Sequence, residues 1–156
     1  MALRTDVALQ AKLLSDARGS DPEAVRAWLA RRTAEEGLVF FVIADAQTGA
    51  AAGYIQADRL RGDALAWRFG ICLADSQQGR GRGPAAIRAL ARHLAETWGA
   101  KRLCLEVGAD NARAIAAYRR LGFEETARHN AHRVAGGVVR DVLAMARAID
   151  RAGLAA

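Results

Sequence analysis

Three glycines and two arginines alternate in the segment QQGRGRG (77–83), and a run with helical spacing, PAAIRALARHLAETW, follows it directly. A helix N-terminus exposes unpaired backbone N–H groups and the positive end of the helix dipole. Glycine lets the backbone approach a bulky anion closely and adopt positive φ. The segment therefore predicts an anion-binding loop suited to a phosphate. The side chains of Arg80 and Arg82 either add charge to that loop or lie in solvent.

Two known phosphate-binding patterns fit this loop. The first is G-x-G-x-x-A, satisfied by GRGPAA (81–86), with Glu106 at the end of the next strand as a possible ribose ligand. It predicts a dinucleotide-binding enzyme, but it needs its first glycine at a strand end, and residues 74–80 intervene here. It also usually opens a domain, whereas three apolar segments precede it in this chain. The second pattern is Q-x-x-G-x-G, which residues 78–83 satisfy.

The Q-x-x-G-x-G pattern resembles the pyrophosphate-binding signature of the GNAT superfamily of acetyl-CoA-dependent N-acetyltransferases. Upstream, GICLADSQ (70–77) resembles the strand that leads into that loop. Downstream, NARAIAAYRRLGF (111–123) resembles the family's second signature, an Asn followed by Ala/Ile, a Tyr and a Gly-Phe pair. The resemblance covers roughly residues 38–148. Its second signature is similar to that of ribosomal-protein N-terminal acetyltransferases, and its first half to acetyltransferases of small molecules and amino sugars.

The resemblance implies that acetyl-CoA binds where two central parallel strands, at about 64–74 and 102–107, splay apart. The backbone of the first strand would pair with the pantetheine arm, and one N–H group there would stabilise negative charge on the thioester oxygen. The N–H groups of the glycine loop would hold the pyrophosphate. Asn111 would either bond to the cofactor or cap the helix that follows it. The cofactor-binding residues so implied are Ile71, Cys72, Leu73, Gln78, Gly79, Arg80, Gly81, Arg82, Gly83 and Asn111.

Acetyl transfer to an amine benefits from a base for the amine and an acid for the departing thiolate. The resemblance implies that Tyr118 is the acid, although its helical spacing with Ile115 and Leu121 also fits simple core packing. Glu106 is the implied base, acting through water, and its alternative is a surface carboxylate or an arginine partner. Asp75 is the second candidate base, and an amine that arrives neutral would need none.

The elements that must position these residues alternate between helix and strand. The segment 21–37 predicts a helix, with Asp21 as its cap, Pro22 in its first position and Gly37 at its end. Three apolar segments then predict an antiparallel meander, a strand–helix–strand–helix unit follows, and a hairpin closes the chain. Residues 7–14 fit either a strand or a helix, and the helical alternative removes the usual first strand from the sheet. The expected strands are 38–45, 51–60, 64–74, 102–107, 123–131 and 138–148. The two later helices are expected to end near Trp98 and Leu121. The expected turns include 61–63, Gly99, Gly122 and Gly136–Gly137.

The resemblance implies one α/β domain over residues 1–156 with the GNAT fold. This is a mixed, mostly antiparallel sheet of six or seven strands, with splayed central parallel strands and helices on both faces. Residues 38–148 would form the cofactor-binding core, and the helical N-terminal segment, residues 1–37, would border the acceptor site. The expected acceptor is a small amine or a nucleotide-linked amino sugar, with a protein N-terminus as the alternative. A non-catalytic acyl-CoA-binding module is a further alternative, and a homodimer would be consistent with the superfamily.

Composition narrows the remaining classes of function. The chain has 156 residues and a net charge of +6, but its arginines are scattered without a block of like charges, which argues against nucleic acid. Cys72 and Cys104 are too few for a disulfide framework and are expected to be reduced core thiols. His129 and His132 lack further ligands, so no metal site is expected. Without a signal-like apolar segment or a run near the ~20 residues of a membrane span, the expectation is a cytoplasmic protein.

Overall fold

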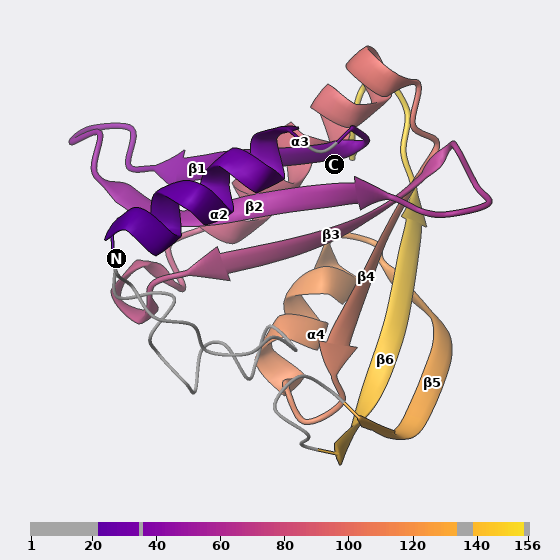
Figure 1. Ribbon diagram of the computed structural model, residues 1–156. Coiled ribbons are helices and arrows are strands. Elements are labelled where there is room, and N and C mark those ends of the chain that lie inside the picture. The colour runs from indigo at the N-terminus through magenta and orange to yellow at the C-terminus, as the bar shows by residue number, and fades with distance from the viewer. Residues whose placement is uncertain (1–21, 35, 134–138, 155–156) are drawn as a thin grey trace.

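The computed structural model describes residues 22–34, 36–133 and 139–154, and Figure 1 shows how they are arranged. In chain order the elements are α2 (Pro22–Ala34), β1 (Leu38–Ala44), β2 (Ala51–Arg59), β3 (Ala66–Leu73), the 3-10 helix η2 (Asp75–Gln77), α3 (Arg82–Trp98), β4 (Arg102–Gly108), α4 (Ala112–Arg120), β5 (Glu124–Arg133) and β6 (Val139–Ala148). Across these described ranges, no helix has both the length and the apolar composition needed to cross a membrane.

The described strands form a mixed six-stranded sheet in the order β1-β2-β3-β4-β6-β5. All neighbours are antiparallel except β3 and β4. The parallel pairing of β3 with β4 begins at Ala66↔Arg102 and stops at Arg68↔Cys104. Because β3 continues to Leu73 and β4 also runs on, the two strands separate toward their C-terminal ends. The expected sheet with splayed central parallel strands is therefore confirmed.

Helices cover both faces of the sheet, as expected. Phe40 and Phe41 are neighbours on β1, so their side chains point to opposite faces. The ring of Phe40 lies 5.2 Å from that of Trp28 on α2, whereas Phe41 lies 5.1 Å from His93 on α3. Figure 1 shows α2 in front of β1 and β2, with α3 behind them. The two helices thus enclose this half of the sheet between them.

The main core lies between the sheet and the helices α3 and α4. The buried residues of α3 recur every three or four positions and form one stripe: Ile87, Leu90, Ala91, Leu94 and Ala95. The strands present alternate residues to that stripe: Ile55, Ala57, Trp67, Phe69, Leu103, Leu105, Val107, Leu143 and Met145. Helix α4 joins the same face through Ile115 and Leu121. The intervening residues of β2, β3 and β4 point to the opposite face, which leaves that side available for a site.

Local turn chemistry sets the limits of the elements around the glycine loop. Gly81 and Gly99 flank α3 with φ of 75° and 65°, and the N–H of Gly99 donates to Leu94 O, which is the expected C-terminal glycine cap. The RGD segment at 61–63 forms the turn between β2 and β3, as predicted. Within that turn the N–H of Asp63 donates to Leu60 O at 3.3 Å.

The third strand is shorter than its apolar run of 64–74 predicts. It begins at Ala66 because the N–H of Ala66 still closes the preceding turn, donating to Asp63 O at 3.2 Å. It ends at Leu73 because Ala74 O already accepts the N–H of Gln77 at 2.8 Å, which starts η2. The expectations for residues 7–14, Asp21 and Gly136–Gly137 lie outside the described residues.

Candidate active site

The gap between β3 and β4 is lined by backbone groups of β3. The N–H of Ala74 donates to Ala52 O, and the β2–β3 register then directs the even-numbered residues of β3 toward β2. The odd-numbered residues Ile71 and Leu73 therefore direct their N–H and C=O groups toward the gap. Cys72 directs its backbone to β2 instead, and its side chain is buried. An extended ligand in the gap could pair with Ile71 and Leu73 as an added strand does.

Gln78 holds the glycine loop in place. Its Nε2 donates to Leu73 O at 3.1 Å and to Asp75 Oδ1 at 2.8 Å. Gly79 and Gly81 both have φ of 75°, a conformation that favours glycine. The loop leads directly into α3, whose first N–H groups have no partner within the helix. This geometry can hold an anion, and the intervening η2 separates it from the strand end where a dinucleotide motif has its first glycine.

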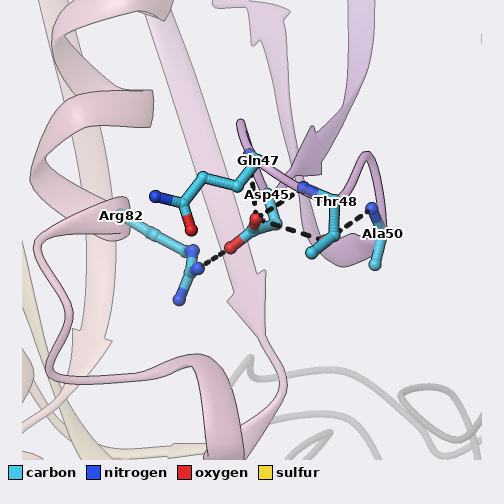
Figure 2. A network of polar contacts seen from close by, with 5 residues as sticks. All are labelled: Asp45, Gln47, Thr48, Ala50 and Arg82. Carbon is cyan, nitrogen blue, oxygen red and sulfur yellow. Dashed lines mark hydrogen bonds and ion pairs between the residues drawn. The ribbon is translucent and has the colours of Figure 1, made fainter.

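Arg82 does not reach the gap, because its side chain extends to the turn between β1 and β2. Figure 2 shows its guanidinium donating through Nη2 to Asp45 Oδ2. Asp45 also accepts the N–H groups of Thr48 and Gln47, each at 3.0 Å. These backbone hydrogen bonds, Thr48 first, together with Arg82 lower the pKa of Asp45 to about 2. Arg82 therefore anchors the start of α3 to the β1–β2 turn, whereas Arg80 is exposed.

The start of α4, which belongs to the second sequence motif, lies beside the glycine loop. Asn111 Oδ1 accepts the N–H of Ala114 at 3.2 Å and so caps α4, while Asn111 also lines the cleft. Arg113 Nη1 donates to Gln78 Oε1 at 3.3 Å. Its Nη2 lies 3.2 Å from the position that a Cβ at Gly79 would occupy. Arg113 is not among the residues that the motifs predict, although its place two residues after Asn111 is a signal for it.

Tyr118 combines core packing with a place at the site. Its ring centroid lies 6.0 Å from that of Phe69 and 6.0 Å from that of Phe123, both in edge-on contacts. It also lines the cleft. Burial raises the pKa of its phenol from 10.0 to about 12. The hydroxyl is therefore protonated at neutral pH, as a proton donor must be.

Glu106 lies on the face of β4 that points away from the core. Its neighbours Leu105 and Val107 are buried, whereas Glu106 is exposed and lines the same cleft as Tyr118. The second candidate base, Asp75, lies in η2 and is not one of the described residues that line the cleft. Of the two candidate bases, the structure therefore places Glu106 beside the gap.

These residues meet in one cleft of about 1520 Å³. Its loop end is formed by Gln78, Gly79, Gly81, Gly83, Asn111 and Arg113. Its β2 end is formed by Glu36, Gln56, Asp58, Arg59, Arg61 and Arg68. Among the described lining residues are Ile71, Cys72, Leu73, Glu106 and Tyr118, but neither Arg80 nor Arg82. No motif predicts the β2 end, because its residues come from separate elements and no fixed spacing connects them.

The cysteines and histidines add little to this chemistry. Cys72 and Cys104 form no disulfide, and burial raises the pKa of the Cys104 thiol, so it is not an activated thiolate. His129 is exposed on β5, and the side chain of His132 lies outside the described residues. In the segments that the structure describes, no three His, Cys, Asp or Glu side chains cluster as metal ligands would.

Taken in order along the cleft, the chemistry is that of a group-transfer site. The loop end can hold a phosphate through backbone N–H groups and Arg113. The gap can hold an extended chain against Ile71 and Leu73. Beyond it, Glu106 supplies a carboxylate and Tyr118 a protonated phenol, which suit removal of a proton from one reactant and its delivery to another.

Comparisons with known proteins point to one family. A family model described as Acetyltransferase (GNAT) domain matches residues 3–124. A mycothiol acetyltransferase of Corynebacterium efficiens is 40% identical over 67 residues, which are 43% of this chain and 22% of the relative. A spermine/spermidine N(1)-acetyltransferase of Bacillus subtilis is 36% identical over 58 residues, 37% of this chain and 38% of the relative. These matches therefore span well under half of each curated relative.

Solved structures show the same fold over nearly the whole chain. A spermidine N-acetyltransferase of Vibrio cholerae, in complex with CoA and spermine, superposes with a TM-score of 0.83 at 18% identity, covering 94% of this chain and 86% of that chain. A ribosomal-protein-alanine N-acetyltransferase of Brucella melitensis gives a TM-score of 0.78 at 22% identity, covering 95% and 91%. At these identities the similarity establishes the fold alone, and the fold agrees with the family match.

Proposed function

The chain belongs to the GNAT acetyltransferase domain family, as the two sequence motifs predict, and from this premise we propose that it transfers the acetyl group of acetyl-CoA to a primary amine. One observation carries the proposal: the glycine loop, the open edge of β3 and the pair Glu106 and Tyr118 share a single cleft. Each region of the cleft suits one portion of the two substrates, and the regions follow one another in the order that the reaction needs.

The loop end suits the pyrophosphate of acetyl-CoA. The N–H groups of Gly79 to Gly83 face an anion best where no side chain intervenes, and a Cβ at Gly81 would meet no heavy atom within 4 Å. That open space is the room that a phosphate needs. Arg113 adds a positive charge beside it, and Asn111 lines the same wall. The cleft, at about 1520 Å³, exceeds the 300–1,000 Å³ typical of smaller ligand pockets.

Ile71 and Leu73 bind the pantetheine arm through the backbone groups that face the gap. Acetyl-CoA supplies an acetyl group activated as a thioester. An N–H of this strand edge stabilises the negative charge that develops on the thioester oxygen. Cys72 contributes through its packing rather than its backbone, which β2 occupies.

Glu106 and Tyr118 move the protons of the reaction. Glu106 accepts a proton from the arriving ammonium through a water molecule, which frees the nitrogen lone pair for attack. The new N–C bond forms as the C–S bond breaks. Tyr118 then gives its proton to the departing sulfur, which leaves as the free CoA thiol. The Tyr118 phenolate takes the second proton of the acetylated nitrogen, which gives the neutral amide. Burial keeps the phenol protonated until that step.

The acceptor is a small-molecule amine in this proposal. Polyamine and mycothiol acetyltransferases among the relatives support a small acceptor. At the β2 end, Arg68 pairs with Asp58 at 2.9 Å and the guanidinium of Arg59 lies over the rings of Trp67 and Trp98, while Arg61 also lines the cleft and would suit a nucleotide-linked amino sugar. A protein N-terminus is the second candidate, supported by the resemblance of the second signature (111–123) to that of ribosomal-protein N-terminal acetyltransferases and by the fold shared with a ribosomal-protein-alanine N-acetyltransferase.

A thermal melt with acetyl-CoA, CoA and NAD in parallel tests the cofactor. A ligand at 100 times its dissociation constant adds roughly 2.7 kcal/mol to the stability of the fold, which corresponds to a shift on the order of 5–10 °C for a domain of this size. We expect that shift with acetyl-CoA and CoA. A shift with NAD alone would contradict the proposal.

Release of free CoA thiol, measured with a panel of amines, then tests the activity. The panel contains spermidine, a nucleotide-linked amino sugar and an alanine-terminated peptide. We expect turnover with a small amine. Tight binding of acetyl-CoA without turnover on any amine would instead indicate an acyl-CoA-binding module.

A further inference from the structure

The charged side chains at the β2 end of the cleft carry more positive than negative charge. Those that line it among the described residues are Glu36, Asp58, Arg59, Arg61 and Arg68, which are two carboxylates and three guanidinium groups. All five are exposed or half-buried. A ligand at this end therefore meets a surface with a net positive charge, which favours an anionic group and disfavours a cationic one.

Two of the three arginines already have partners within the protein. Arg68 Nη2 lies 2.9 Å from Asp58 Oδ2, and the two residues face each other across β2 and β3. The guanidinium carbon of Arg59 lies 5.4 Å from the ring centroid of Trp67 and 5.3 Å from that of Trp98, which is close enough for cation–π contact with both. Asp58 and these two arginines are therefore engaged before any acceptor binds.

Arg61 is the remaining arginine at this end. Its side chain is exposed, and within the described part of the chain it has no hydrogen bond, ion pair or ring contact. Its backbone is nevertheless fixed, because it occupies the second position of a turn that the N–H of Asp63 closes by donating to Leu60 O at 3.3 Å. A guanidinium group on a fixed turn at the wall of the cleft is suited to bind a phosphate or a carboxylate through two parallel hydrogen bonds.

The distance along the sheet between this turn and Glu106 limits the ligand. The N–H of Leu60 donates to Ala66 O at 2.9 Å, so the turn that carries Arg61 begins beside Ala66. Ala66 pairs with Arg102 on β4, and Glu106 lies four residues further along that strand. At roughly 3.3 Å per residue, the separation is on the order of 13 Å. A ligand that reaches from Glu106 toward Arg61 therefore has its two polar groups separated by several bonds.

We propose that the acceptor is a primary amine that also carries an anionic group, a phosphate or a carboxylate, which Arg61 binds while the amine lies at Glu106. This inference rests on the acetyltransferase function proposed above and assigns Arg61 as the residue that selects among acceptors. The separation of about 13 Å excludes α-amino acids, whose carboxylate is attached to the carbon that bears the amine. A polyamine fits poorly, because it presents further ammonium groups to Arg61 and because Asp58 is already paired with Arg68.

The test compares kcat/KM for ω-amino alkanoic acids, alkylamines and α,ω-diamines of matched, increasing chain length. A nucleotide-linked amino sugar and the same sugar without its phosphates form a further pair, which separates a phosphate from a carboxylate ligand. In the wild type, the acid-bearing amine should be preferred once its chain spans the two groups, and the diamine should be the poorest substrate. Arg61→Gln should reduce the preference for the acid over the alkylamine about fivefold, the upper range for an exposed ion pair. Arg61→Glu should reverse it, so that the diamine becomes the better substrate.

Arg151→Gln is the matched control. Arg151 also occupies the second position of a turn, which the N–H of Gly153 closes by donating to Asp150 O at 2.8 Å, but it does not line the cleft. This variant should keep the wild-type preference, and CoA affinity measured by calorimetry should be the same in all variants. An unchanged preference in Arg61→Glu would overturn the inference while the acetyltransferase activity stands, as would a wild-type preference for diamines. Absence of turnover with every amine would instead refute the proposed function itself.

Discussion

The two ends of the cleft are built in different ways. At the loop end, two polar side chains that line the cleft have partners within the protein: Gln78 binds Leu73 O and Arg113, and Asn111 caps α4. At the β2 end, Arg68 pairs with Asp58, whereas Gln56 Oε1 is buried without a partner among the described residues. The loop end is therefore built from residues of two contiguous motifs, whereas the β2 end collects side chains from separate elements.

This contrast follows from what each end would bind. Acetyl-CoA is the same molecule for every member of the family, so backbone N–H groups on a tightly bonded loop can serve it without side-chain specificity. The acceptor amine differs between members, so its recognition falls to side chains on separate strands. Substitutions at the loop end should therefore change CoA affinity, whereas those at the β2 end should change acceptor kinetics.

The largest effect is expected from Gly81→Asp. It places a carboxylate against the phosphates on a residue with φ of 75°, and like charges in contact weaken binding by about 100-fold or more. Calorimetric titration with CoA measures the loss. Gly62→Asp is the matched control, because Gly62 also has positive φ and open space around it but lies in the β2–β3 turn. Wild-type affinity in Gly81→Asp would remove the loop from the site.

The second-largest effect is expected from substitutions of the two residues proposed to transfer protons. Tyr118→Phe and Glu106→Gln should each lower kcat by about 100-fold, the lower end of the range for general acid–base catalysis. CoA affinity should remain unchanged in both. Single-turnover kinetics with the best amine give the chemical rate. Should both variants keep the wild-type rate across the pH range, the assigned acid and base are wrong even though the cleft binds its substrates.

A smaller effect on CoA is expected from Asp45→Asn. Without the carboxylate, Arg82 loses its anchor (Figure 2), and the loop end loses some of its prior order, so the dissociation constant for CoA should rise about two- to fivefold. The amine KM should not change. Asp63→Asn breaks a different surface ion pair, with Arg102, and serves as the control. An altered amine KM with unchanged CoA affinity would contradict the division between the two ends.

The ion pair between Asp45 and Arg82 should be insensitive to pH above about 4. The pKa of Asp45 falls from 3.8 to about 2 in the folded protein, so its stabilising contribution is present above the unfolded value and is lost only as pH falls toward 2. CoA affinity of the wild type and of Asp45→Asn, measured from pH 5 to pH 8, should therefore keep a constant ratio. A ratio that approaches one near pH 5 would show that Asp45 is not held as described.

The smallest expected change concerns Tyr118 in alkali. Because the folded pKa is about 12 against 10.0 for an unperturbed phenol, the unfolded chain releases this proton first. Stability is therefore lost as pH rises from about 10 toward 12, and kcat should show no decline from Tyr118 below pH 10. Urea unfolding of wild type and Tyr118→Phe at several pH values measures the first effect, which should be absent in the variant. An alkaline fall in kcat near pH 8 that disappears in Tyr118→Phe would show that the phenol is not buried as described.

Much of the fold could be predicted from local pattern. Apolar runs bounded by turn residues predict β1, β2 and β4 to within a residue or two, and Gly99 correctly ends α3. The start of β3 could not be predicted in this way, because Ala64 and Leu65 are as apolar as the strand itself. Their place in the turn is set by the hydrogen bond from Ala66 to Asp63, which no periodicity records.

The candidate site, like the fold, was predictable only where its residues lie close together along the chain. The residues of the loop end lie in two contiguous motifs, so the sequence predicts them with the exception of Arg113. The side chain of Arg82 shows the limit, since its partner Asp45 lies 37 residues away in the chain. Sequence spacing carries no information on a contact of that range.

By itself, the sequence determined the family, the order of the elements and the loop that would hold a phosphate, because these depend on residues that are close along the chain and on the backbone freedom of glycine. Only the tertiary structure decided that Gln56 lies opposite Gly70, that β3 and β4 separate beyond the pair Arg68 and Cys104, and that the side chain of Arg82 is held by Asp45. The physical reason is register. The pairing of strands from distant regions of the chain sets which side chains share a face, and only the folded sheet fixes it.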